Sequence, residues 1–385
     1  MSFIYSIDGT GRVPPRAEAF GDQHLRLGER LMQSGALSMA DLRDALARYA
    51  RHRGTARFGD YLVAEGAISR RALLRAISEQ HGLGLVDLTQ MAADWEVNAG
   101  LDPVRCLDLE FVIWHRLGGT LIVAVADPLR IPEIRAEIGP VDERLAFAVA
   151  DSRAIQHEVT RIHGPQLARR ARTRCPEAAS CRAPRLTRLR RIALLAVLGL
   201  ASVAVMYPAM VVTALLIWIV LANFATTLLR GAALATGAWR DPVPQRLDPS
   251  VASLADHRPY PIISILVPLL REDRILPQLI AAIEGLDYPR DCLDVKLLLE
   301  ADDTVTRESL HRVALPPWID VLTVPDDTLR TKPRAMNYAL DFCEGGIIGI
   351  YDAEDRPDPD QLRKVARHLS TAPPTLACVQ ARRGL

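Results

Sequence analysis

The sequence predicts an α/β protein built from three kinds of structure. They are a helical-repeat and small α/β N-terminal domain, a transmembrane helical hairpin, and a Rossmann-like domain with a mostly parallel sheet. Three observations predict this order: a pattern that recurs after 31 residues, a long apolar stretch without charge, and apolar strands that alternate with helices. The net charge of +1 gives no general attraction to nucleic acid, so no nucleic-acid partner is expected.

The repeat lies near the amino end, where residues 26–49 align with residues 57–80. Each unit predicts a short helix, a glycine that ends it, a serine N-cap and a second amphipathic helix. The identical pairs include both glycines and both caps: Arg26/Arg57, Gly28/Gly59, Leu31/Leu62, Gly35/Gly66, Ala36/Ala67, Ser38/Ser69, Leu42/Leu73 and Ala45/Ala76.

Strand-like segments follow from about residue 101, and a closing helix begins near Asp151, which indicates a small α/β lobe. We therefore expect one N-terminal domain over 21–163, preceded by a flexible leader at 1–20. Residues 164–191 are rich in Arg, Ala and Pro and predict a basic linker.

Residues 192–229 contain no charged side chain and predict a transmembrane segment. A single helix of that length would measure about 57 Å, against a hydrocarbon core of about 30 Å. Two helices with a break near Tyr207–Pro208 fit this better, and one tilted span is the alternative. Arginines flank both sides, which favours a hairpin with both ends in the cytoplasm.

After a linker at 230–258, residues 259–385 predict the parallel sheet, whose last apolar strand would be an uncovered edge. Carboxylates follow two of its strands at the edge where open α/β sheets bind ligands. Oxygen ligands clustered there favour Mg²⁺ or Mn²⁺ bridging a diphosphate, and solvated turn acids are the alternative. The two clusters are Glu300, Asp302 and Asp303, and Asp352, Glu354 and Asp355.

Between the two clusters, Lys332 and Arg334 lie at the start of an expected helix. Positive charge and free amide groups at a helix N-terminus both favour phosphate. The alternative is a pair of surface cations without a ligand.

The segments VPLLRE, LLLEADDTVT, TKPRAMNYAL and YDAEDRPDPDQL resemble successive motifs of processive family 2 glycosyltransferases, over about 260–385. The resemblance implies a partial GT-A domain, a nucleotide-sugar donor (a UDP-sugar) and a glycan acceptor. It implies donor binding by Glu300, Asp302, Asp303, Lys332, Arg334, Asn337 and Asp352, and metal binding by Asp352, Glu354 and Asp355.

Two positions depart from that family's pattern: Glu354 replaces an Asp, and Arg271 replaces the usual Asn. The family's general base and its QxxRW motif follow these segments, so we expect the base beyond Leu385 and assign no catalytic residue here. Donor binding with poor turnover is therefore expected of this chain.

The repeat and the lobe after it resemble the N-terminal (MshEN) domain of type II secretion ATPases, over about 21–163. In that family the paired units bind cyclic di-GMP, which the resemblance implies here for Arg26, Gly28, Arg57, Gly59 and Gln80. The first unit has Tyr49 in place of Gln, and the second has Phe58 in place of Leu. A docking domain without a ligand is the alternative.

Three functions are compatible with parts of this pattern. The first is a glycosyltransferase in the bacterial inner membrane, with both soluble domains cytoplasmic and with regulation by cyclic di-GMP. The second, a secretion ATPase, is excluded, because Lys296, Lys332 and Lys364 are the only lysines and none lies in a P-loop. The third is a membrane-bound cyclic dinucleotide receptor or scaffold with an inactive, truncated transferase domain.

Overall fold

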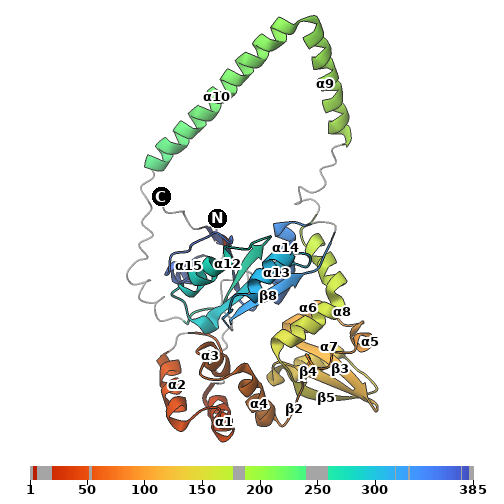
Figure 1. The fold of residues 1–385 in the computed structure, drawn as a ribbon, viewed down its shortest axis with the longest axis vertical. Helices are drawn as coiled ribbons and strands as arrows, with labels where there is room; N and C mark the ends of the chain where they lie inside the picture. Colours follow the sequence, from red (N-terminus) through yellow and green to blue (C-terminus); the bar gives the residue numbers. More distant parts are fainter. Residues whose placement is uncertain are drawn as a thin grey trace. The chain divides into compact units, whose positions relative to one another are not determined.

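A computed structural model describes residues 3–6, 20–51, 54–176, 187–239, 259–316, 318–327, 330–373 and 375–380 (Figure 1). The chain forms two compact units. The first combines Met1–Arg174 with Ala252–Leu385, and the second is Cys175–Val251. The predicted α/β class with a largely parallel sheet is confirmed.

The first unit begins with two helix pairs that share one apolar core. The turns inside the pairs are alike, because Gly35 and Gly66 adopt φ values of +70° and +71°, which favour glycine. A Cβ on Gly59 would lie 2.6 Å from a methyl carbon of Leu73, so this glycine lets the helices of the second pair approach closely. The helices are α1 (Phe20–Gln33), α2 (Met39–Arg51), α3 (Phe58–Ala64) and α4 (Arg70–His81).

A small α/β lobe follows, with the strand order β2-β5-β4-β3. Strands β3 and β4 are antiparallel, whereas β5 is parallel to both β4 and β2. The elements are β2 (Gly84–Leu85), α5 (Trp95–Asn98), α6 (Pro103–Leu109), β3 (Phe111–Leu117), β4 (Thr120–Val125), η1 (Pro128–Arg130), α7 (Ile131–Ile138), β5 (Arg144–Val149) and α8 (Ser152–Thr173).

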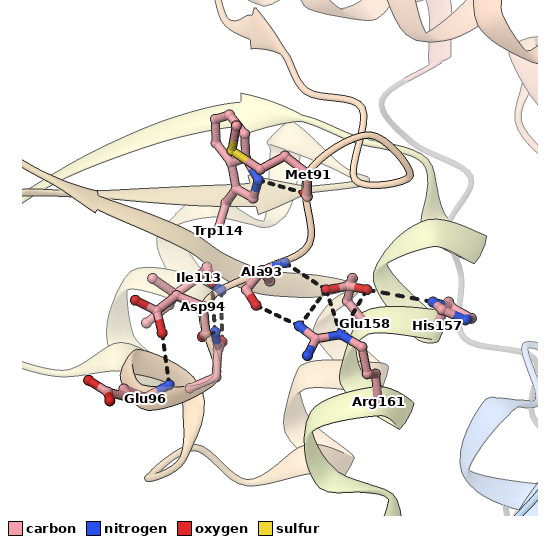
Figure 2. Close-up of polar contacts among 10 residues, drawn as sticks. Met91, Ala93, Asp94, Glu96, Ile113, Trp114, His157, Glu158 and Arg161 are labelled. Atoms are coloured by element: carbon pink, nitrogen blue, oxygen red, sulfur yellow. Dashed lines mark hydrogen bonds and ion pairs between the residues drawn. The ribbon is translucent and has the colours of Figure 1, made fainter.

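A buried carboxylate fixes α8 to this lobe (Figure 2). Glu158 accepts the Ala93 N–H at 2.6 Å and an N–H of Arg161 at 2.8 Å, and Arg161 also donates to the Ala93 carbonyl. Burial acts to raise the pKa of Glu158, but the hydrogen bonds from Arg161 and Ala93 outweigh it and lower that pKa. Trp114 closes the same loop by donating to the Met91 carbonyl at 3.0 Å. A paired buried charge of this kind orients the helix that contains it.

Helix α8 continues through Pro165 to Thr173, although the sequence predicts a linker from residue 164. Leu167, Ala168 and Ala171 are buried, and their packing keeps this arginine-rich segment helical. Polarity of composition is a weak guide here because only one side of the helix is apolar.

The second half of the first unit is a six-stranded sheet with the order β10-β1-β9-β6-β7-β8. Strands β9, β6, β7 and β8 are parallel. The elements are β1 (Phe3–Ser6), β6 (Ile263–Leu269), α12 (Leu276–Glu284), η3 (Arg290–Cys292), β7 (Leu293–Glu300), α13 (Thr304–His311), β8 (Ile319–Val324), α14 (Lys332–Ala339), η4 (Leu340–Phe342), β9 (Ile347–Ile350), α15 (Gln361–Thr371) and β10 (Cys378–Gln380).

The two faces of this sheet belong to different apolar cores. Ile265 and Val267 of β6 pack with α12 and α15, whereas Leu266 belongs to the core that also contains α14 and residues of α6 and α8. Side chains alternate along a strand, so one strand serves both cores. The N-terminal lobe and the sheet therefore share a hydrophobic core.

The expectation of an uncovered edge at the last apolar strand is wrong. Strand β1, from the expected leader, pairs antiparallel with β9, and β10 pairs with β1. An open strand edge presents unpaired N–H and C=O groups, and the chain's own amino end satisfies them here.

The second unit contains α9 (Thr187–Met206) and α10 (Pro208–Trp239), which meet at Tyr207. Proline is well tolerated at the start of a helix and poorly inside one, which explains the break. Among the described residues, Pro208–Ala235 is long and apolar enough to cross a membrane, and Arg191–Met206 is a shorter apolar helix.

Candidate functional site

The carboxyl ends of β6, β7 and β9 lie next to one another, because these strands are parallel neighbours. Asp302 and Asp303 follow β7, and Asp352 follows β9. This edge is the usual ligand-binding edge of an open α/β sheet.

Lys332 and Asp352 form an ion pair at this edge, although 19 residues lie between them in the sequence. Lys332 is the first residue of α14, and both side chains are partly open to solvent. Asp355 closes the turn after β9 by accepting the Asp352 N–H at 2.9 Å. Asp302 is ion-paired in turn with Arg330, a residue that lies just outside the motifs quoted above. The edge is thus lined by charges of both signs.

Asp303 is buried and caps α13. It accepts the Arg271 N–H at 2.6 Å, and the hydroxyl and N–H of Thr306 at 2.7 and 3.0 Å. Burial acts to raise the pKa of Asp303, but these hydrogen bonds outweigh it and lower that pKa. Arg271 has a φ of +56°, in the left-handed region that Asn adopts more readily than Arg. This is a physical reason for the Asn that the resemblance leads one to expect there.

Glu300 and Arg334 form a buried ion pair. The Arg334 Nη2 lies 2.6 Å from the Glu300 Oε2, and the Arg334 Nη1 donates to the Pro325 carbonyl at 2.9 Å. Arg334 has no exposed surface, and Glu300 is 8% exposed. Burial raises the pKa of Glu300, and the Arg334 guanidinium acts in the opposite direction. The pair joins the end of β7 to α14 and to the segment after β8.

Asn337 faces the N-terminal lobe. Its side-chain N–H donates to the backbone carbonyl of Ala171 at 3.2 Å, and its backbone carbonyl accepts from the Arg174 guanidinium at the same distance. Arg170 and Arg174 both pair with Asp341, a side chain that is only 4% exposed. Helix α8 therefore lies beside α14, the helix that begins with Lys332 (Figure 1).

The described residues contain no group of three or more His, Cys, Asp or Glu side chains placed to hold a metal ion. Glu354 is exposed in the turn between Asp352 and Asp355. Mg²⁺ needs only one or two carboxylates when substrate phosphates supply other ligands, so these side chains fit a metal that arrives with a diphosphate. The Thr331 hydroxyl, next to Lys332, is buried and has no hydrogen-bond partner among the described residues.

The residues of the repeat lie elsewhere. Arg57, Gly59 and Gln80 line a cavity of about 720 Å³. Gly28 packs against Leu42, as Gly59 does against Leu73, so both glycines have a packing role. The side chain of Arg26 lies outside the described part of the chain.

The two departures from the MshEN pattern contact each other. The rings of Tyr49 and Phe58 lie 5.1 Å apart in an edge-to-face arrangement, and the Tyr49 hydroxyl donates to the Ala56 carbonyl at 2.9 Å. Burial raises the pKa of Tyr49 to about 12. Edge-to-face pairs are favourable, so the two rings stabilise the packing of the repeat. The two residues belong to different units of the repeat, so the sequence alone does not predict that their rings are in contact.

Comparison with known protein families gives one match within the N-terminal half. The MshEN domain matches residues 81–169, a range that begins after Gln80 and so excludes the repeat. The matched range covers the small lobe and most of α8.

Known relatives of the chain are glycosyltransferases at low identity. It is 24% identical over 143 residues to the beta-monoglucosyldiacylglycerol synthase of Synechocystis sp., covering 37% of this chain and 29% of the relative. It is 28% identical over 152 residues to glucomannan 4-beta-mannosyltransferase 1 of Oryza sativa subsp. japonica, covering 37% of this chain and 27% of the relative. The chain thus spans less than a third of the length of either relative.

Two solved structures resemble parts of the chain. One is MshE with cdg, at 26% identity and a TM-score of 0.32, covering 36% of this chain and 98% of that one. The other is the mannosyltransferase PcManGT from Pyrobaculum calidifontis in complex with GDP-Man and Mn²⁺. It is 23% identical with a TM-score of 0.26, covering 38% of this chain and 42% of that one.

Proposed function

We propose that this chain belongs to a membrane-anchored glycosyltransferase that takes a sugar from a nucleotide-sugar donor, with Mg²⁺ or Mn²⁺, for transfer to a glycan or other acceptor. The observation that carries the proposal is the ion pair of Lys332 with Asp352 at the carboxyl edge of a parallel sheet. The named glycosyltransferase relatives support it.

The pair suits a metal diphosphate because one side chain can bind the metal ion and the other can bind a phosphate. Asp352 provides a carboxylate oxygen, and Lys332 provides an ammonium group at the N-terminus of α14, where phosphate is favoured. A divalent cation bound there stabilises negative charge on the leaving diphosphate. Asp302, paired with Arg330 at the same edge, is assigned to the nucleoside. Glu300 and Arg334 are assigned to fixing the end of β7, in place of direct contact with the donor.

For the whole chain we propose an MshEN-like domain near 21–163, a membrane segment within 192–229 and a GT-A-like domain over 259–385. Both soluble parts would face the cytoplasm at a bacterial inner membrane. The apolar helix Pro208–Ala235 and the arginines that flank 192–229 support this arrangement.

The second candidate is a membrane-bound receptor for cyclic di-GMP. In one version the bound ligand regulates the transferase, and in the other the transferase part is inactive. The cavity lined by Arg57, Gly59 and Gln80 favours it, because three residues of the resemblance meet there. A pure docking role for the N-terminal domain predicts no ligand in this cavity.

Donor binding is tested by calorimetric titration of the detergent-solubilised chain with UDP and Mn²⁺. We expect Asp352→Ala and Lys332→Ala each to weaken binding by about tenfold or more, as for a lost charge-assisted contact. Asp360→Ala is the matched control, since Asp360 is an exposed acid that pairs with Lys364 at the start of α15. Equal affinity of Asp352→Ala and the unsubstituted chain would overturn the proposal.

A further inference from the structure

Helix α8 of the N-terminal lobe follows β8 of the transferase-like half (residues 259–385) from one end of that strand to the other. Near the start of the helix, the Arg153 Nε lies 2.5 Å from the Oδ1 of Asp320, the second residue of β8. Near its end, the Arg172 Nη1 lies 3.5 Å from the Oδ1 of Asp327, which follows β8. A helix of 22 residues is about 33 Å long, whereas a strand of six residues is about 20 Å long. The helix is therefore long enough to pair with charges at both ends of the strand.

The last turns of α8 also hold the segment that ends α14. Asp341, two residues after α14, pairs with the Arg170 Nε at 3.3 Å and with the Arg174 Nη1 at 2.8 Å. The Asp341 side chain is almost buried, whereas both arginines are partly exposed. A carboxylate this deeply buried is stable only with partners, so the two arginines and Asp341 form one charged clamp between α8 and α14 (Figure 1).

The clamp supplies a directional contact that apolar packing does not. Leu167 and Ala171 of α8 belong to the same apolar core as Ala335 and Tyr338 of α14. Apolar burial has no preferred direction, whereas charge-assisted hydrogen bonds need particular donor and acceptor atoms. The ion pairs of Asp341 therefore fix how far along α8 the helix α14 lies.

Helix α14 depends on such contacts because it has only eight residues, and a helix of that length is not stable alone. Arg334 joins it to β7 through Glu300, and Asp341 joins its end to α8. Its first residue is Lys332, which pairs with Asp352 at the carboxyl edge of the sheet. A displacement of about 1 Å at a working site can cost about 100-fold in rate, so a loosened α14 should weaken the contact of Lys332 with a phosphate.

We infer that α8 positions Lys332 for the donor, with Asp341 as the positioning residue that Arg170 and Arg174 hold. The inference rests on the donor site proposed above, and it adds that this site is complete only while α8 is docked on α14. The N-terminal lobe is then a working part of the donor site through its last helix. Any change that separates α8 from α14 lowers donor affinity.

The first test is calorimetric titration of the full chain in detergent with UDP and Mn²⁺. Asp341→Asn keeps the shape of the side chain and removes its charge, and we expect it to weaken binding about fivefold. Arg170→Gln combined with Arg174→Gln should do the same, whereas Lys at both positions should retain most of the affinity because the charges remain. Arg116→Ala is the matched control, because it removes a similar ion pair, with Glu143 at 2.7 Å, within the lobe itself.

A double-mutant cycle separates positioning from a general loss of stability. If Asp341 acts through Lys332, adding Asp341→Asn to Lys332→Ala should weaken UDP binding by less than about twofold further. A full fivefold loss in that background overturns the inference, as does unchanged affinity in both the Asp341 and the arginine variants. Circular dichroism melting sets a titration temperature at which every variant is folded. The arginines are partly exposed, so their variants test the clamp even if Asp341→Asn is unstable.

Hydrogen exchange followed by mass spectrometry tests the clamp without any donor. Peptides that cover 332–342 should exchange at least about threefold faster in Asp341→Asn than in the unsubstituted chain, and no faster in Arg116→Ala. Unchanged exchange in Asp341→Asn overturns the inference. If the unsubstituted chain does not bind UDP, the proposed donor site fails, and the exchange rates still decide whether α8 holds α14.

Discussion

The buried pair of Glu300 and Arg334 gives the sharpest prediction. Replacing Glu300 with Leu leaves the Arg334 guanidinium with no exposed surface and no carboxylate. Removing one partner of a buried pair costs about 3–5 kcal/mol. For a unit of this size about 1 kcal/mol corresponds to roughly 2 °C, so the melting temperature should fall by about 6–10 °C.

A double variant separates a structural role from donor binding. Glu300→Leu combined with Arg334→Met removes both charges and loses chiefly the 2.9 Å hydrogen bond to the Pro325 carbonyl. It should melt only about 2–4 °C below the unsubstituted chain, since replacing a buried pair by apolar groups is often near neutral. Binding of UDP with Mn²⁺ should recover together with stability.

Two results would refute this reasoning. If the double variant is no more stable than Glu300→Leu, the unpaired charge of Arg334 is not the cause of the lower melting temperature. If stability recovers but UDP binding does not, then Glu300 or Arg334 contacts the donor directly. Melting is followed by circular dichroism in detergent, and binding is measured by calorimetry on the same preparations.

Two further predictions concern the segment beside this pair. Arg271→Asn should raise the melting temperature by about 1–2 °C, because Arg271 has a φ of +56° and Asn adopts the left-handed region at lower cost. An unchanged or lower melting temperature would contradict the argument that Arg271 is strained. Asp303→Asn should lower the melting temperature most above about pH 5. The folded pKa of Asp303 is depressed, so the stability it contributes is present above its unfolded pKa near 3.9 and is lost as the pH falls below that value. A difference between this variant and the unsubstituted chain that does not shrink between about pH 6 and pH 3.5 would show that Asp303 is not held ionised by its hydrogen bonds.

Local patterns in the sequence are sufficient to predict the parallel strands that form the candidate site. Strands β6, β7 and β9 are short, largely apolar segments with polar residues after them, and that pattern indicates buried parallel strands with polar tips. Parallel strands place their carboxyl ends at one edge, so the sequence alone assigns Lys332 and Asp352 to one region. The glycines at 35 and 66 are equally predictable, because a helix end with positive φ favours that residue.

The partners of the polar groups are not predictable in this way. Lys332 and Arg334 are two residues apart at the start of the same helix, yet one reaches the partly exposed Asp352 and the other the buried Glu300. Asn337 belongs to the same motif and contacts Ala171, which lies far away in the chain. A motif records residue types and spacing, whereas the direction of each side chain depends on what packs against the helix.

The sequence by itself determined the α/β class, the positions of the parallel strands β6, β7 and β9, and the charges that follow β7 and β9. These features follow from local periodicity and from the geometry of parallel strands. Only the tertiary structure decided that β1 covers the edge of β9, that α8 extends to Thr173 and lies against α14, and that Arg290 shares a cavity with Arg57. These features depend on contacts between residues tens to hundreds of positions apart, where burial and pairing select one of many arrangements that the local sequence allows.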